Sequence, residues 1–222
     1  DHHTYLEAAK SAADAGVAWV ALHARTAEQM YEGKADWSAI KNLVEHLKPT
    51  GVPVLGNGDI WSGADGVEMV RQTGCAGVVV GRGCLGRPWL FADLVDAFNG
   101  GNNRVLPSLH EVREVMFRHG ELIVDYFESE DRGCRDLRKH MAWYLKGFRV
   151  HSELRRQFGM VGSLTELRSL LDQLDDQPYP VEIGEKPRGR TSSGRPPTLP
   201  DGWLNDPDEM IHLDVEDMFS GG

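Results

Sequence analysis

The chain has few cysteines and no long hydrophobic run, and both shortages narrow what it can be. Its 222 residues include three cysteines, an odd number without CxxC spacing, which argues against a disulfide framework and a zinc site. No apolar run approaches the ~20 residues of a membrane span. The N-terminus carries neither an initiating Met nor a signal-peptide pattern. We therefore expect a cytoplasmic protein without a membrane or metal partner, whose sequence here begins inside a longer chain.

Positive charge is also scarce, but only in parts of the chain. The net charge of −10 argues against an indiscriminate nucleic-acid binder. Residues 132–156 nevertheless hold eight Lys and Arg against two Asp and Glu, whereas residues 200–222 hold seven acids and no Lys or Arg. The local basic segment is compatible with a polyanionic partner.

Helical and strand patterns alternate through the first part of the chain. Short Val-rich runs, apolar on both faces, predict strands at 17–24, 52–57 and 76–81. Apolar residues at helical spacing predict helices at 4–15, 36–47 and 62–73, the last capped by Ser62, and a fourth that opens at Pro88. This order implies parallel strands joined by right-handed crossovers.

The second part of the chain is organised differently. An Asn- and Gly-rich linker at 99–107 is followed by helical periodicity throughout, which predicts a small all-α domain at 108–176. Residues 1–98 would form a separate α/β domain. From 177 to 222 the composition is rich in Pro, Gly, Ser and charge, so we expect an extended or disordered tail.

Glycine-bearing turns end the second and third predicted strands. Gly56 and Gly58 belong to the first turn, and Gly81 and Gly83 to the second. Glycine lets an anionic ligand approach backbone N–H groups, and Arg82 adds a planar cation. One such turn is more often an ordinary tight turn, but two in succession, about one βα unit apart, predict a phosphate site.

Polar side chains stand at the same strand ends. His23 and Arg25 close the first strand, at the edge where barrels and α/β sheets bind ligands, and their donors suit a phosphate or a heterocycle carbonyl. Asn57 and Asp59 flank Gly58 and have two interpretations. They are ordinary turn residues, or they meet a ribityl chain or phosphate with Asp59 orienting the loop, and both can hold together.

The glycine turns match a position known in eight-stranded barrels. The common phosphate site of such barrels lies after strands seven and eight, which would make the three predicted strands about strands 6–8. Three strands cannot close a barrel of eight. We therefore expect an α/β fold that is the C-terminal part of a TIM (β/α)8 barrel, followed by the all-α domain.

One predicted helix separates apolar from basic residues. Its apolar stripe consists of Leu137, Met141, Tyr144 and Phe148. Its other side carries Arg135, Arg138, Lys139 and Lys146. A solvated charged face is the default for any one helix, but the local excess of bases favours contact with phosphates.

Four segments of the chain resemble a known family. They are, in order, LHARTAEQMYEGKADW, VPVLGNGDI, TGCAGVVVGRGCLGRPWLF and RDLRKHMAWYLKGF. Over about residues 1–175, the chain resembles the C-terminal half of a bacterial tRNA-dihydrouridine synthase, closest to the B-type branch. The resemblance implies an FMN-containing (β/α)8 barrel followed by helices that grip tRNA. It also implies that NADPH reduces the flavin, which then gives hydride to C6 of a uridine and saturates its C5=C6 bond.

The resemblance also assigns residues to roles. By it, FMN would be contacted by His23, Asn57, Gly58, Asp59, Gly81 and Arg82. Arg25 would lie nearer the substrate uridine, and tRNA would meet Arg135, Arg138, Lys139 and Lys146. The family's proton-donor cysteine belongs to the earlier half of the barrel, so we expect no catalytic residue here. Cys75 is expected in the core and Cys84 beside the phosphate loop. The chain alone would be inactive, and the full-length form a monomer.

Two other functions fit parts of the pattern. Another phosphate-binding barrel enzyme, such as a different FMN oxidoreductase or a sugar-phosphate synthase, would share the glycine turns but would not need the basic helix. A non-catalytic RNA-binding protein would share the basic helix without the reaction.

Overall fold

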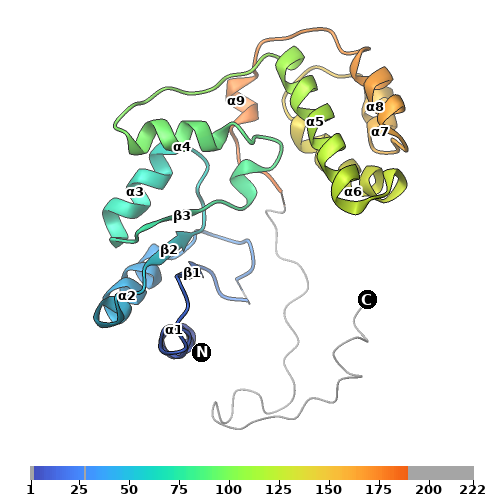
Figure 1. Ribbon diagram of the computed structural model, residues 1–222. Helices are drawn as coiled ribbons and strands as arrows, with labels where there is room; N and C mark the ends of the chain where they lie inside the picture. Colours follow the sequence, from blue (N-terminus) through green and yellow to red (C-terminus); the bar gives the residue numbers. More distant parts are fainter. Residues whose placement is uncertain (1–2, 28, 190–222) are drawn as a thin grey trace.

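The computed structural model describes residues 3–27 and 29–189 (Figure 1). The strands of the sheet alternate with helices along the chain, in the order α1 (Tyr5–Asp14), β1 (Val20–His23), α2 (Trp37–Leu47), β2 (Val54–Asn57), α3 (Gly63–Thr73), β3 (Gly77–Val79) and α4 (Leu90–Phe98). The later elements are α5 (Leu109–Phe127), α6 (Glu130–Tyr144), α7 (Ser152–Phe158), α8 (Leu164–Leu171) and α9 (Val181–Gly184). Short 3-10 turns cover Lys48–Thr50 and Arg82–Cys84. No helix within the described ranges is long and apolar enough to cross a membrane.

The three strands pair in parallel in the order β1, β2, β3, which confirms the prediction of parallel strands. Each strand is shorter than its predicted span, and all three strands end at nearly the same level. His23 lies opposite Asn57, which in turn lies opposite Val79. Since parallel strands end at one edge, the loops that follow them are brought together there.

One face of the sheet is covered by helices, and the other is open within the described residues. Val54 and Gly56 of β2 are buried, and a β-carbon on Gly56 would overlap with Met69 of α3. Ala21 and His23 of β1 alternate to the opposite face and are exposed. Because side chains alternate along a strand, Asn57 shares this open face with His23.

Buried side chains form two groups, one around the sheet and one among the later helices. The first includes Ile40, Leu43, Leu47, Met69, Leu90 and Cys75, which is 3% exposed, as predicted. The second includes Leu109, Met116, Leu137, Phe158 and Leu167. Figure 1 shows α5 to α8 grouped away from the sheet, with α9 between them and α4. The domain boundaries at 98 and 108 stay a prediction that these two cores support.

Serine caps set the start of several helices. The Ser62 hydroxyl accepts a hydrogen bond from Asp65 N–H, and the Asp65 carboxylate accepts one from Ser62 N–H, so the predicted cap is present. Ser108 and Glu111 form the same capping box at the start of α5. Each such cap contributes about 1 kcal/mol.

Residues 177–189, here named the C-terminal strap, differ from the extended or disordered tail expected from residue 177. Leu109 N–H donates to Gln177 O at 2.8 Å, and the Gln177 amide bonds both backbone groups of Arg149 at 2.8 and 2.9 Å. Tyr179 is 9% exposed within the helical core. A few anchoring side chains thus order a segment of polar composition. Residues 190–222 of the predicted tail lie outside the described residues.

Candidate cofactor and RNA site

The carboxyl ends of the three strands surround a pocket of about 230 Å³. Its lining includes all the residues predicted to bind FMN: His23, Asn57, Gly58, Asp59, Gly81 and Arg82. Tyr31, Trp61 and Gly83 complete much of the wall. The fold therefore gathers the predicted residues at one place, as expected for the ends of parallel strands, while their binding of FMN stays a prediction.

The amide of Asn57 connects all three strand ends. Its Nδ2 donates to Val79 O at 2.6 Å, which leaves Oδ1 facing His23 Nδ1, with which it is hydrogen-bonded. An amide oxygen only accepts, so Nδ1 of His23 is the donor.

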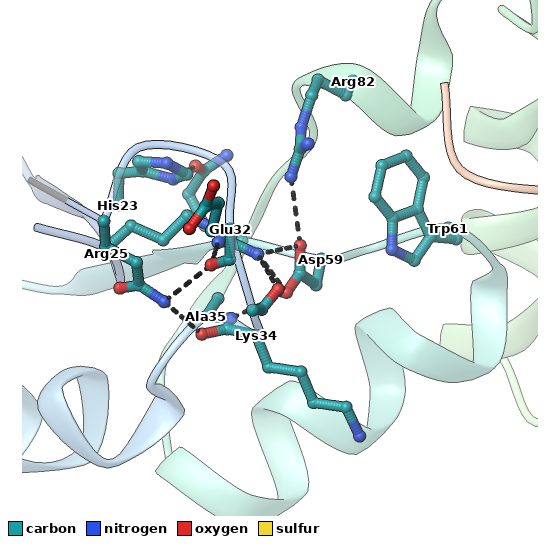
Figure 2. Close-up of polar contacts among 12 residues, drawn as sticks. His23, Arg25, Glu32, Lys34, Ala35, Asp59, Trp61 and Arg82 are labelled. Carbon is teal, nitrogen blue, oxygen red and sulfur yellow. Dashed lines mark hydrogen bonds and ion pairs between the residues drawn. The ribbon is translucent and has the colours of Figure 1, made fainter. Parts of the chain in front are cut away.

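Asp59 is the centre of the polar contacts at this edge. Its backbone is left-handed, with φ of 54°, in the loop after β2. Arg25 Nη2 lies 2.9 and 2.7 Å from its two carboxylate oxygens, and Arg82 Nη2 lies 3.2 Å from Oδ1. The N–H of Ala35 donates to Oδ2 at 2.7 Å. Figure 2 shows both guanidinium groups pointing toward Asp59, whereas the Lys34 side chain points away from the cluster.

The neighbours of Asp59 favour its ionised form. Burial by itself raises the pKa of Asp59, but the hydrogen bond from Ala35 and the charges of Arg25 and Arg82 outweigh it and hold the pKa below 3.8. Two guanidinium groups, of Arg25 and Arg82, thus contact one carboxylate. Guanidinium donors of this kind suit an anion such as a phosphate.

Arg25 lies near the start of the loop between β1 and α2, and its side chain is bonded to later residues of that loop. Its side chain is 2% exposed, and besides Asp59 it donates to Glu32 O at 2.6 Å and to Gly33 O at 3.0 Å. These contacts fix the loop between β1 and α2 over the β2 end. Contact between Arg25 and a uridine stays a prediction, and in this conformation the guanidinium is used to hold the loop.

Two aromatic residues that the sequence interpretation missed enclose Arg82. Its Cζ lies 4.6 Å from the ring centre of Tyr31 and 5.2 Å from that of Trp61. Such contacts orient a guanidinium by attraction to the ring faces. Trp61 stands two residues after Asp59, so its place in a ligand loop was a usable signal. No such signal exists for Tyr31, because its position in a loop does not indicate which residue its ring contacts.

The glycines show how closely the chain approaches itself at this pocket. A β-carbon on Gly83 would overlap with the carbonyl oxygen of Ile60, and one on Gly58, whose φ is 132°, would meet Ala35 Cβ at 2.6 Å. A β-carbon on Gly81, in contrast, would meet no protein atom within 4 Å. Gly81 therefore leaves open space next to the backbone of the pocket wall, as a phosphate-binding turn requires.

The four residues predicted to bind tRNA all lie on α6 or just beyond it, and all have partners within the chain. Arg135 pairs with Asp131, and Lys139 Nζ lies 2.6 Å from Asp136 Oδ1. Arg138 donates to Val161 O at 2.8 Å, and Lys146 donates to Pro187 O at 2.6 Å. The apolar stripe of the same helix is buried as predicted: Leu137, Met141, Tyr144 and Phe148. Arg135 and Lys139 keep exposed side chains, so they are the better placed of the four for phosphates.

Cys84 is held by the turn that contains it. Its thiol donates to Gly81 O at 3.1 Å, and burial raises its pKa. It therefore stays protonated at neutral pH and is engaged with the backbone, which fits the expected place beside the phosphate loop rather than a catalytic role.

Comparison with known proteins identifies the family. The profile of "Dihydrouridine synthase (Dus)" matches residues 1–178. A probable tRNA-dihydrouridine synthase of Mycobacterium leprae is 51% identical over all of this chain, and one of Mycobacterium tuberculosis is 50% identical. The chain spans 57% and 56% of these two relatives. The tRNA-dihydrouridine synthase B of Pasteurella multocida is 34% identical over 72% of the chain and 47% of its own length, which supports the B-type resemblance. The chain belongs to the dihydrouridine synthase family.

Proposed function

We propose that this chain forms the cofactor-phosphate and tRNA-binding part of an FMN-dependent tRNA-dihydrouridine synthase. The observation that carries the proposal is the pocket at the strand ends, where Gly81 leaves room beside the backbone and the Arg82 side chain forms part of the wall. Family membership removes the first alternative, an unrelated phosphate-binding barrel enzyme. We place the protein in the cytoplasm and expect the full-length form to be a monomer.

The sheet supports its assignment to about strands 6–8 of a (β/α)8 barrel. Within the described residues, β1 and β3 each pair on one side only, and one face of the sheet has no covering element. Large apolar side chains are exposed just before β1, at Trp19 (53%), and on α4, at Phe91 (50%) and Val95 (62%). Open edges and exposed apolar surface are features that further strands and helices of a barrel would cover.

The residues of the pocket fit the phosphate and ribityl part of FMN. Arg82 supplies positive charge, the turn from Gly81 to Gly83 supplies close backbone approach, and Asn57 and His23 supply polar groups on the open face. Asp59 holds Arg82 and the loop before α2 in place. When bound, FMN supplies hydride transfer, with NADPH as the source of electrons. The task of this chain is then to anchor the phosphate end and fix the position of the ring.

The proton donor is proposed to lie outside this chain. Cys75 and Cys134 are buried, and the Cys84 thiol is bonded to Gly81 O, so none of the three is presented to a substrate. General acid catalysis contributes about 10²- to 10⁴-fold, and the chain lacks this contribution.

The chain alone, given FMN, NADPH and unmodified tRNA, is expected to form no measurable dihydrouridine. A fusion to the N-terminal part of the M. leprae relative that this chain does not cover is expected to form it. Dihydrouridine is measured by mass spectrometry of digested tRNA. Turnover by the chain alone would refute the placement of the proton donor. A folded fusion that binds tRNA without turnover would favour the non-catalytic RNA-binding alternative.

Binding of tRNA by the chain is expected to weaken steeply with salt. If Arg135, Arg138, Lys139 and Lys146 meet phosphates, each lost contact lowers the log–log salt slope by about 0.7 to 0.9. Arg135 and Lys139 are the more exposed, so the double variant Arg135→Ala, Lys139→Ala should account for most of the change. Substitution of Arg118, an exposed arginine on α5 paired with Glu121, serves as the control. An unchanged slope in the quadruple alanine variant would contradict the assignment.

A further inference from the structure

The C-terminal strap connects the helical domain to the turn that follows β3. Arg188 in the strap donates to Leu85 O at 3.1 Å and to Gly184 O at 3.1 Å, and it also donates to Trp143 O. Leu85 directly follows the 3-10 turn Arg82–Cys84, and Trp143 lies in the last turn of α6. One side chain thus joins the strap, the proposed phosphate turn and the end of α6.

The backbones in this region approach each other closely. Gly86 has a φ of 61°, and a β-carbon there would meet the N of Tyr144 at 2.5 Å. Gly189 has a φ of 73°, and a β-carbon there would lie 3.1 Å from Leu85 Cδ1 and 3.3 Å from Arg82 Cγ. The end of the strap therefore packs against the aliphatic part of the Arg82 side chain. Because the backbones are this close, a movement of the turn would require the strap or the end of α6 to move with it.

The neighbouring residues of the strap extend this contact. Pro187 lines a hollow of about 840 Å³ together with Arg82 and Trp61. Lys146, beyond the end of α6, donates to Pro187 O at 2.6 Å and to Lys186 O at 3.1 Å. The strap thus lines the hollow that contains the Arg82 side chain. Lys146, just beyond the end of α6, bonds the backbone of the strap at this point.

Burial of the charged Arg188 side chain costs free energy, because the charge is removed from water. Arg188 is 3% exposed, and among the described residues no carboxylate lies within ion-pair distance of it. Carbonyl oxygens of Leu85, Trp143 and Gly184 accept its hydrogen bonds, and the hydroxyl of Tyr179 lies close to it. Burial lowers the pKa of Arg188 to about 10, so it still carries its charge at neutral pH. A planar cation with donors on several sides can bind three separate carbonyl groups at once, which an apolar side chain of the same volume cannot do.

We propose that Arg188 is a positioning residue for the cofactor, which holds the turn carrying Arg82 against the end of α6. The inference rests on the proposed function, because it assumes that this turn binds the phosphate of FMN. It assigns a role to the strap, most of which lies beyond residue 178, where the match to the family profile ends.

The test compares two arginines that both bind carbonyl groups. Arg155 donates to Leu145 O at 3.0 Å, Phe148 O at 2.7 Å and Val150 O at 3.2 Å, all within the helical domain. Arg155→Met removes a comparable set of bonds without touching the phosphate turn. Arg188→Met and Arg188→Lys are made beside it, in the chain and in the fusion described above. Affinities for FMN and for riboflavin, which lacks the phosphate, are measured by flavin fluorescence.

Arg188→Met is expected to weaken FMN about tenfold and to leave riboflavin unchanged, because a displaced Arg82 would lose one charged hydrogen bond to the phosphate. Arg188→Lys should recover part of this loss, and Arg155→Met should not change the ratio of the two affinities. Amide hydrogen exchange at residues 82–85 should rise in Arg188→Met but not in Arg155→Met. Equal ratios in the two methionine variants, or equal exchange at 82–85, would overturn the inference while FMN still binds the wild type. Failure of the wild type to prefer FMN over riboflavin would overturn the proposed function as well.

Discussion

Replacement of Asp59 by asparagine is expected to destabilise the protein by about 3–5 kcal/mol, because it leaves the Arg25 guanidinium buried without its counter-charge. The Arg25 side chain is 2% exposed and its ion pair with Asp59 is 2.7 Å long, so solvent cannot replace the lost carboxylate. For a chain of this size the melting temperature should fall by roughly 6–20 °C. The same variant should also bind FMN more weakly, since Arg82 loses its ion pair with Asp59.

An exposed ion pair provides the matched control. Asp131 pairs with Arg135 on the surface of α6, where the side chains are 70% and 60% exposed. Such pairs contribute about 0–1 kcal/mol, so Asp131→Asn should leave the melting temperature nearly unchanged. Equal effects of the two substitutions would show that the Asp59 cluster is not the buried network described above.

The pH dependence follows from the same carboxylate. The folded pKa of Asp59 lies below 3.8, so its contribution to stability is present above that pH and is lost as the pH falls through the folded value. The difference in melting temperature between the wild type and Asp59→Asn should therefore be constant near neutral pH. It should close only below about pH 3.8.

The sheet and the pocket could be predicted because their signals are local. Val-rich runs and the glycines after them fix which segments are strands and where the strands end, and parallel pairing then brings those ends together. The register that places His23 opposite Asn57 was not predicted from the sequence and comes from the structure. The apolar stripe of α6 followed from helical spacing in the same way.

The contacts that sequence reasoning missed are those between distant segments. Arg25 was expected near a uridine, yet it meets Asp59, 34 residues later in the chain. Arg188 reaches Leu85 across 103 residues. No periodic pattern in the sequence links Arg25 to Asp59 or Arg188 to Leu85. The strap has the composition of a disordered tail, because polar residues outnumber the few residues that anchor it. Composition measures the average of a segment, whereas order here depends on two or three side chains.

Alanine substitutions at Gly81 and Gly83 are expected to separate cofactor affinity from stability. A β-carbon on Gly83 would overlap with the carbonyl oxygen of Ile60, a backbone atom that cannot move aside without shifting the loop after β2. Gly83→Ala should therefore destabilise the protein by about 1–3 kcal/mol and weaken FMN together with it. Gly81→Ala meets no protein atom within 4 Å, so stability should stay within about 0.5 kcal/mol of the wild type.

The two variants should differ most in how they discriminate FMN from riboflavin. In Gly81→Ala the new methyl group occupies space beside the turn that the phosphate is proposed to use, so FMN should weaken by at least about tenfold while riboflavin is unaffected. Gly162→Ala, whose β-carbon makes only an ordinary 3.6 Å contact with Glu166, controls for the substitution itself. Thermal melts and flavin titrations on the same samples give both quantities. Unchanged FMN affinity in a stable Gly81→Ala protein would mean that the phosphate binds elsewhere, because no other effect of that methyl group could hide the loss.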